Sequence, residues 1–268
     1  ERYKHYIKKL LDEGKAYRCF CSKSDLKNFK KDGYAFYPGT CRNLTNDEIK
    51  TKLNQGKSFT IRIKLEEGHT EFNDLVYGAI KINNKELDDF IIARSDGSPT
   101  YNFTVVVDDY EMEISHVIRG DDHLSNTPKQ LIIYKNLELK APIFAHLPMI
   151  LGSDKKRLSK RHGAPGVQSF KDKGYFPDSI LNYLALLGWN PKNEKEVLDA
   201  DELINLFSFD QVQKKGAAWD EKKLHWLSGQ HVQNKNSQFL LDQIRLLDSD
   251  WGKNSDISTL INIINSLK

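Results

Sequence analysis

The sequence of 268 residues has few cysteines and no long apolar run, and both features restrict what the chain can be. No segment approaches the ~20 consecutive apolar residues that a helix needs to cross a bilayer. The first twenty residues are rich in charged side chains and lack the apolar core of a signal peptide. Three cysteines cannot form a disulfide framework, and an odd number points to reduced thiols or metal ligands. We therefore expect a cytoplasmic protein with no membrane segment.

The sequence also lacks an excess of charge of one sign and the common glycine-rich phosphate loops. Its 40 basic and 37 acidic residues give a formal net charge of +3, so any basic surface must be local. A Gly-Lys-Ser triplet at 56–58 has Thr51 where a P-loop needs its first glycine, and it leads into a strand pattern. No G-x-G-x-x-G occurs either. A nucleotide therefore has to be held in another way.

The N-terminal part of the chain changes from a helical to a β pattern. Apolar side chains at 3.6-residue spacing predict a helix over 3–11. Residues 59–65 alternate between apolar and polar, and the apolar runs 76–82 and 87–93 flank an Asn83-Asn84 turn signal. These patterns predict a mostly antiparallel β region over 58–94.

Beyond this region, short apolar runs alternate with helical patterns. Residues 113–119 and 143–149 have the composition of strands, and we expect the first of them to be buried. Thr127 and Pro128 indicate a helix start between these two strands. This order predicts an α/β unit, and from Pro177 onward the pattern becomes helical.

The densest cluster of positive charge, at 151–163, directly follows the last predicted strand. Such runs are usually solvated surface. Ligands of open α/β sheets, however, bind beyond the carboxyl ends of strands, and several cations suit the charge that develops on a leaving pyrophosphate. The segment Arg157-Leu158-Ser159-Lys160-Arg161 resembles the KMSKS loop of class I aminoacyl-tRNA synthetases. Its continuation, His162-Gly163-Ala164, resembles the form found in glutamyl-tRNA synthetases.

The resemblance to bacterial glutamyl-tRNA synthetases extends over nearly the whole chain. It implies ATP-dependent activation of L-glutamate as an acyl-adenylate, with Mg²⁺ accompanying ATP, and transfer of glutamate to the 3′ end of tRNA(Glu). It places Arg157, Ser159 and Lys160 in the catalytic loop, and we expect a monomer. The other similar blocks are 87–92, 96–103, 105–109, 117–123, 174–177 and 181–189.

The resemblance also implies the fold class and the domain organisation. We expect an α/β fold, consisting of part of a class I Rossmann-type catalytic domain, an inserted zinc-containing α+β acceptor-binding domain and an α-helical stem-contact domain. No HIGH signature is found in the sequence. We expect that signature upstream of Glu1 and most of the anticodon-binding domain beyond Lys268, so that this fragment alone does not form the adenylate. The expected divisions are the end of the first Rossmann half at 1–18, the inserted domain at 19–98, the second Rossmann half with the KMSKS loop at 99–165, and the stem-contact region with the start of the anticodon-binding domain at 166–268.

Arg119 closes an apolar strand and is followed by a glycine and two carboxylates. A guanidinium can hold a carboxylate through two parallel charge-assisted bonds. The resemblance assigns Arg119 and Tyr101 to the pocket for the substrate glutamate, with Asp122 and His123 in the same substrate site. Such a pocket rejects glutamine because the arginine would lose its charged partner. Two alternatives stay open: Arg119 can pair with Asp121 or Asp122, and Tyr101 can be a core residue.

The three cysteines and one tyrosine form the pattern C-x-C-x15-Y-x3-C, made by Cys19, Cys21, Tyr37 and Cys41 beside an irregular, lysine-rich stretch. The resembling family inserts its acceptor-stem-binding domain here, and several bacterial members bind zinc there through cysteines with a histidine or tyrosine. Three thiolates need a fourth ligand for tetrahedral Zn²⁺, and no histidine lies between 16 and 61, which makes Tyr37 the candidate. The alternative is three reduced, partly buried cysteines with Tyr37 as a packing residue.

Two other functions fit parts of the sequence. A glutamyl-queuosine tRNA(Asp) synthetase shares the catalytic core and the Cys, Cys, Tyr, Cys arrangement, but its chain ends soon after the core, whereas 107 residues follow Arg161 here. A non-catalytic tRNA-binding module is compatible with the missing HIGH signature.

Overall fold

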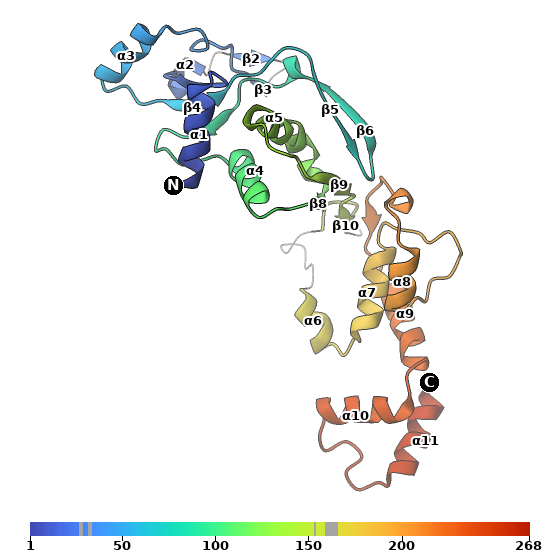
Figure 1. The fold of residues 1–268 in the computed structure, drawn as a ribbon. Coiled ribbons are helices and arrows are strands. Elements are labelled where there is room, and N and C mark those ends of the chain that lie inside the picture. Colours follow the sequence, from blue (N-terminus) through green and yellow to red (C-terminus); the bar gives the residue numbers. More distant parts are fainter. Residues whose placement is uncertain (27–28, 32–33, 153, 159–165) are drawn as a thin grey trace. The chain divides into compact units, whose positions relative to one another are not determined.

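The computed structural model describes residues 1–26, 29–31, 34–152, 154–158 and 166–268 (Figure 1). The chain divides into two compact units, 1–146 and 147–268. No helix within the described residues is both long enough and apolar enough to span a membrane.

The first unit contains helices and two main β-sheets. Its helices are α1 (Arg2–Asp12), α2 (Lys23–Leu26), α3 (Asn46–Asn54), α4 (Tyr101–Glu111) and α5 (Thr127–Leu137), with the 3₁₀-helices η1 (Asn84–Glu86) and η2 (Asp121–Asn126). Its strands are β1 (Ala16–Cys19), β2 (Lys30–Lys31), β3 (Tyr34–Ala35), β4 (Thr60–Ile63), β5 (His69–Asp74), β6 (Gly78–Asn83), β7 (Ile91–Ala93), β8 (His116–Gly120) and β9 (Ile143–Leu147).

The two main sheets differ in strand direction. Strands β1, β4 and β7 form an antiparallel sheet in that order, with Tyr17 opposite Arg62. The second sheet has the order β6-β5-β9-β8. Its β5–β6 pair is an antiparallel hairpin, whereas β5 lies parallel to β9 through Asp74 and Phe144. This mixed sheet therefore joins a hairpin from the predicted β region to strands from the predicted α/β unit.

Local sequence explains where several helices begin and end. Helix α1 has the predicted period, and the chain turns after it at Gly14, whose φ of 66° suits a residue without Cβ. Helix α5 carries Pro128 in its first turn, where a missing N–H needs no partner. Helix α3 begins with a capping box, in which Thr45 and Glu48 each bond the other's backbone N–H.

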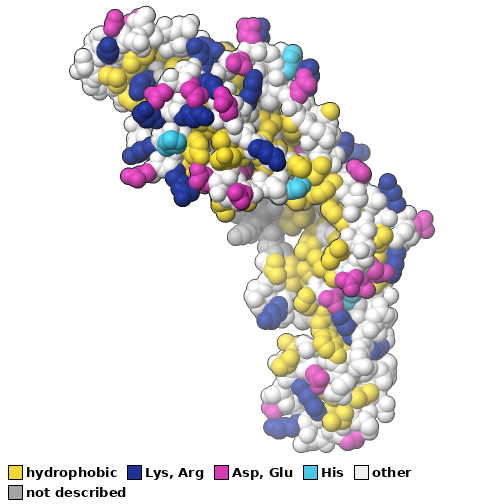
Figure 2. All heavy atoms as spheres, in the orientation of Figure 1, with side chains coloured by type: hydrophobic (Ala, Val, Ile, Leu, Met, Phe, Trp, Pro, Cys, Tyr) yellow, Lys and Arg dark blue, Asp and Glu magenta, His cyan; other side chains and the backbone are white. Residues whose placement is uncertain are grey.

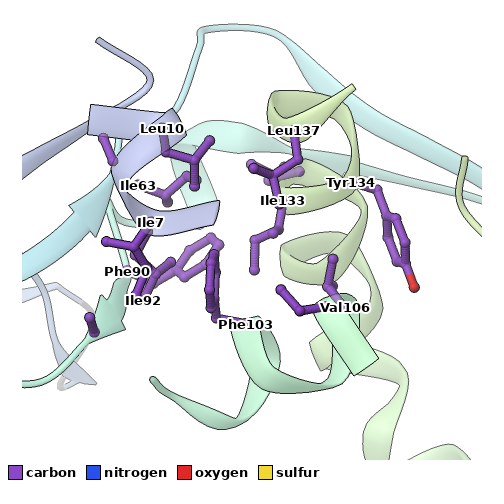
Figure 3. Close-up of a cluster of buried hydrophobic side chains, with 14 of the residues drawn as sticks. Ile7, Leu10, Ile63, Phe90, Ile92, Phe103, Val106, Ile133, Tyr134 and Leu137 are labelled. Atoms are coloured by element: carbon purple, nitrogen blue, oxygen red, sulfur yellow. The ribbon is translucent and has the colours of Figure 1, made fainter. Parts of the chain in front are cut away.

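The core of the first unit lies among α1, α4, α5 and the antiparallel sheet (Figure 3). Helices α4 and α5 contact each other, and α1 contacts both. Burying each large apolar side chain here contributes about 1.5–3 kcal/mol relative to leaving it exposed. The side chains labelled in Figure 3 are Ile7, Leu10, Ile63, Phe90, Ile92, Phe103, Val106, Ile133, Tyr134 and Leu137.

The second unit is mostly helical. Strand β10 pairs in parallel with β11, and a Cβ at Gly216, just before β11, would lie 2.8 Å from the Met149 carbonyl oxygen. One core forms around Tyr183 of α7 and Leu227 of α9, and another joins α10 and α11. Its elements are β10 (Ile150–Leu151), α6 (Val167–Asp172), α7 (Pro177–Leu186), α8 (Ala200–Leu206), η4 (Phe209–Gln211), β11 (Ala217–Ala218), α9 (Glu221–Gln233), α10 (Ser237–Leu247) and α11 (Ile257–Leu267).

The structure confirms most predicted elements and corrects two. Asn83-Asn84 is not a hairpin turn: β6 pairs with β5 and β7 pairs with β4, and the strand 69–74 was not predicted. Residues 101–111, for which no element was predicted, form helix α4. The strand expected at 113–119 starts at His116, and it is not fully buried, because Ile118 is 53% exposed.

Candidate functional site

Arg119 lies at the end of β8, and neutral side chains hold its guanidinium. Its Nε donates to His146 Nε2 at 3.2 Å, and its Nη2 donates to Thr127 Oγ1 and Gln130 Oε1, both at 2.8 Å. Three of the five N–H donors of the guanidinium are thereby used. The contacts with His146, Thr127 and Gln130 leave Nη1 unused, and Tyr101 also interacts with the guanidinium through its side chain.

The alternative ion pair of Arg119 with its neighbouring carboxylates does not form among the described residues. Asp121 instead accepts a hydrogen bond from the Tyr77 hydroxyl at 2.8 Å, and Asp122 lies 4.0 Å from His123 Nε2. Burial lowers the pKa of Arg119, while Tyr101 and Asp109 raise it. The guanidinium stays charged in any case, since arginine is not deprotonated in proteins. It is thus a half-buried cation that has no salt-bridge partner within the described part of the chain.

Tyr101 is the first residue of α4, and its side chain reaches the surroundings of Arg119. It is 50% exposed, so the alternative of a core tyrosine is wrong. Its ring lies 5.9 Å from the ring of His123, and it is close enough to Arg119 to affect the pKa of the guanidinium. The structure therefore brings Tyr101, Arg119, Asp122 and His123 together around the start of η2.

A buried Asp–His pair lies behind Arg119, and sequence reasoning missed it. The Asp74 and His146 side chains are fully buried, and Asp74 Oδ2 lies 2.6 Å from His146 Nδ1. Asp74 Oδ1 also accepts from the N–H groups of Val76 and Tyr77, which forms the β5–β6 turn. The one available signal was a histidine inside the apolar run 143–149.

The pKa shifts fix the ionisation of this pair. Burial raises the pKa of Asp74, but hydrogen bonds from the turn N–H groups and from His146 lower it by more than burial raises it. The pKa of Asp74 is therefore below the usual value. Burial lowers the pKa of His146, Asp74 opposes this, and Arg119 and His123 lower it. The pair is therefore a carboxylate and a neutral imidazole at neutral pH.

The predicted cysteine cluster is assembled in the first unit. The three Sγ atoms lie within 4.8 Å of one another, with Cys21 and Cys41 3.6 Å apart. The Tyr37 hydroxyl lies 3.4 Å from Cys19 Sγ and accepts a hydrogen bond from the Cys41 N–H at 2.9 Å. Cys19, Cys41 and Tyr37 are buried, and Arg62 stacks on the Tyr37 ring with its guanidinium carbon 3.7 Å from the centroid.

The thiols of this cluster differ in acidity. Burial raises the pKa of Cys19, but its hydrogen bond with the Tyr37 hydroxyl and that from the Cys21 N–H, together with Arg62, bring the pKa below the usual value. Burial and the neighbouring Cys41 raise the pKa of Cys21 to about 12. Of Cys19 and Cys21, Cys19 is therefore the thiol that ionises more readily.

A buried carboxylate supports the cluster from one side. Asp89 accepts from the Tyr17 hydroxyl at 2.7 Å, from Arg42 Nη1 at 2.6 Å and from the Leu65 N–H at 2.9 Å. Tyr17 packs against the cysteines, and Arg42 follows Cys41 directly. Asp89 thus ties the cysteine segment to the antiparallel sheet.

The lysine-rich loop begins in the second unit as a tight turn. Leu151 and Arg157 form an antiparallel bridge, and the Leu158 N–H donates to the Ile150 carbonyl at 2.8 Å. The Arg157 side chain is exposed. Ser159 and Lys160 lie outside the described residues, so only the beginning of the predicted catalytic loop can be placed.

An apolar cavity of about 960 Å³ also lies in the second unit, along α6, α7, α10 and α11. Figure 2 shows apolar side chains at the surface of this unit, with basic and acidic side chains beside them. None of the described residues predicted for the site lines this cavity.

Comparison with known proteins identifies relatives over most of the chain. The sequence model described as "tRNA synthetases class I (E and Q), catalytic domain" matches residues 1–226. A "Glutamate--tRNA ligase 1" of Caldanaerobacter subterraneus subsp. tengcongensis is 47% identical over 240 residues, which cover 87% of this chain and 50% of that protein. A "Glutamate--tRNA ligase" of Hydrogenobaculum sp. is 42% identical over 275 residues, covering 99% of this chain and 59% of that protein.

A solved structure agrees with these relatives. The crystal structure of a glutamate tRNA ligase from Elizabethkingia meningosepticum in complex with its amino acid matches with a TM-score of 0.82 and 28% sequence identity, over 98% of this chain and 59% of that one. The chain spans about half the length of the first curated relatives that it matches. The family match covers the Arg119 site, the cysteine cluster and the start of the lysine-rich loop, and on this ground the chain belongs to the class I tRNA synthetases of the glutamate and glutamine type and carries their catalytic domain.

Proposed function

We propose that the protein carrying this chain is a glutamate–tRNA ligase, which activates L-glutamate with ATP and transfers it to the 3′ end of tRNA(Glu). The observation that carries this proposal is the charge of the site. Arg119 is a half-buried guanidinium that neutral side chains hold, so a substrate carboxylate would supply its missing countercharge. The family match and the names of the relatives support the same substrate.

In this proposal, each residue around Arg119 has a role in binding glutamate. The N–H groups of Nη1 donate to the side-chain carboxylate, because those of Nε and Nη2 are already used. The exposed Tyr101 hydroxyl donates to the same carboxylate, and Asp122 and His123 close the site beside it. Glutamine offers no charge to this cation, so the pocket discriminates between the two amino acids electrostatically.

The lysine-rich loop acts on the other substrate. Arg157, Ser159 and Lys160 hold the phosphates of ATP, and Mg²⁺ neutralises part of their charge when bound. Cations at this position act most strongly when charge builds on the leaving pyrophosphate.

We also propose that Cys19, Cys21, Cys41 and Tyr37 hold one structural Zn²⁺. Tetrahedral coordination with Zn–S bonds of about 2.3 Å requires sulfur atoms about 3.8 Å apart. The 3.6 Å between Cys21 and Cys41, and the 4.8 Å limit for all three Sγ atoms, fit that requirement. The Tyr37 hydroxyl, 3.4 Å from Cys19 Sγ, is placed to complete the set. A bound ion would fix a segment that has little core of its own.

On this proposal, each expected domain of the chain has the function that the resemblance implies. Residues 19–98 form the inserted domain that binds the acceptor stem, 99–165 form the second Rossmann half, and 166–268 contact the inner part of tRNA. The protein acts as a cytoplasmic monomer.

The test is aminoacylation by the full-length protein. We expect ATP-dependent charging of tRNA(Glu) with L-glutamate, and no charging of queuosine-modified tRNA(Asp). The variant Arg119→Ala should lose about 2–5 kcal/mol in kcat/KM for glutamate, the scale for breaking a desolvated charge pair, with KM for ATP nearly unchanged. Preferential charging of tRNA(Asp), or binding of tRNA without any charging, would favour one of the two other functions.

A further inference from the structure

Three polar groups behind Arg119 form one continuous set of hydrogen bonds. Asp74 accepts from His146 Nδ1 at 2.6 Å, and His146 Nε2 accepts from Arg119 Nε at 3.2 Å. Thr127 Oγ1 accepts from Arg119 Nη2 at 2.8 Å and lies 3.0 Å from His146 Nε2. All of these side chains except that of Arg119 are fully buried. We propose that Asp74 and His146 are positioning residues that fix the Arg119 guanidinium for substrate recognition.

The direction of each hydrogen bond follows from the charge of Asp74. A carboxylate only accepts, so His146 must carry its proton on Nδ1. Its Nε2 then carries a lone pair and no proton. Only this tautomer of the ring can accept hydrogen bonds at Nε2 from Arg119 and Thr127. With the other tautomer, or with a doubly protonated ring, an N–H would point at the cation. Asp74 therefore sets the tautomer, and the tautomer sets whether Arg119 is held.

The orientation of the guanidinium follows from the same contacts. His146 and Thr127 hold one edge of the plane, and Gln130 Oε1 accepts the second proton of Nη2 at 2.8 Å. Gln130 is itself held by Asn102, to which its amide donates at 3.1 Å. Nη1 is left to face the substrate, and the plane cannot rotate without breaking these bonds. Fixing a recognition group in advance lowers the cost of binding its ligand.

Two substitutions of His146 separate positioning from a purely structural role. In His146→Asn, the shorter amide can still donate to Asp74, but nothing reaches Arg119. In His146→Gln, the longer side chain can place its oxygen near the Nε2 position and accept from Arg119, while the donor to Asp74 is lost. Positioning predicts that the Gln variant keeps more glutamate recognition than the Asn variant. A structural role through Asp74 predicts the reverse order.

The measurement is the KM for L-glutamate and for ATP, with kcat, in aminoacylation by the full-length protein. We expect the KM for glutamate to rise about 10- to 100-fold in His146→Asn and to stay within about 3-fold in His146→Gln, with the KM for ATP unchanged in both. Asp74→Asn should also raise the KM for glutamate about 10- to 100-fold, because its amide would donate to Nδ1 and move the ring proton to Nε2. His69→Asn, an exposed histidine on β5, is the matched control and should behave as the wild type.

The inference rests on the proposed function, and the two can fail separately. If the wild-type protein does not use glutamate, both are overturned. If it does, and Arg119→Ala raises the KM for glutamate while the His146 and Asp74 variants do not, only the positioning role is overturned. The reverse order of the two His146 variants, with equal melting temperatures, also refutes positioning.

Discussion

Replacing Asp89 by alanine should destabilise the first unit more than any single exposed substitution in the cysteine region. The change removes the acceptor of the Tyr17 hydroxyl, the Arg42 guanidinium and the Leu65 N–H at once. The Asp89 side chain is 6% exposed, and that of Arg42 is 30% exposed. The pair is therefore shielded on the carboxylate side and partly solvated on the cation side.

The magnitude follows from this environment. Removing one partner of a buried pair costs about 3–5 kcal/mol, and the partial exposure of Arg42 favours the lower end. About 3 kcal/mol in a unit of this size corresponds to a fall of roughly 6–12 °C in melting temperature. Tyr17 and the Leu65 N–H donate to different oxygens of Asp89, so Asp89→Asn keeps an acceptor for only one of them and loses the charge; it should still cost less than the alanine variant.

Urea and thermal unfolding of the full-length protein measure both values. The adjacent Asp88→Ala is the matched control: among the described residues, Asp88 accepts a single side-chain hydrogen bond, from the Tyr37 N–H at 3.1 Å, and its loss should cost about 1 kcal/mol or less. Equal losses in the Asp89 and Asp88 variants would refute the assignment of Asp89 as the carboxylate that anchors this segment.

The cysteine cluster, the lysine-rich loop and the buried histidine each give a further measurable prediction. Elemental analysis should find about one mole of zinc per mole of wild-type protein and a large loss in Cys41→Ser; less than about a tenth of a mole in the folded wild type would rule out the zinc site. Lys160→Ala should slow adenylate formation about 10²- to 10³-fold and spare transfer from a preformed adenylate, as pre-steady-state kinetics can resolve; equal loss in both steps would contradict this. Burial lowers the pKa of His146, so below about pH 6.5, the value in the unfolded chain, the unfolded state binds more protons than the folded state, and the free energy of unfolding should decrease as the pH is lowered. In urea denaturation between pH 5 and 7, the free energy of unfolding of His146→Gln should depend less steeply on pH than that of the wild type. The same slope in both proteins would exclude His146 as the cause of the pH dependence.

Short-range patterns predicted the elements that are determined by local sequence. The helix at 3–11 and the helix start at Thr127 were visible because periodicity and a first-turn proline act within a few residues. Helix α4 was missed because its valine run favours a strand by composition. Burial of Phe103, Val106 and Val107 against α5 outweighs that preference.

Pairing between strands that are distant in the sequence could not be predicted from local patterns. Asn83-Asn84 has the composition of a hairpin turn, yet the partner of β6 is the unpredicted β5. The site also combines features that can and cannot be predicted from sequence. Arg119 and the four-residue cysteine–tyrosine pattern could be found by resemblance and spacing. The contact between Asp74 and His146, in contrast, joins residues 72 positions apart. No local pattern encodes such a contact, because it depends on which strands become neighbours.

The parallel pairing of β5 with β9 also has a consequence for how the chain folds. The β5–β6 hairpin closes locally and can form early, within microseconds in isolated hairpins. The other edge of β5 stays unpaired until Phe144 of β9 has been synthesised, which takes several seconds more at typical rates of synthesis. During that interval Asp74 has neither His146 nor the strand beside it, and the open edge can pair wrongly. Slowing translation between these segments should therefore lower the yield of folded protein more than slowing it after residue 147.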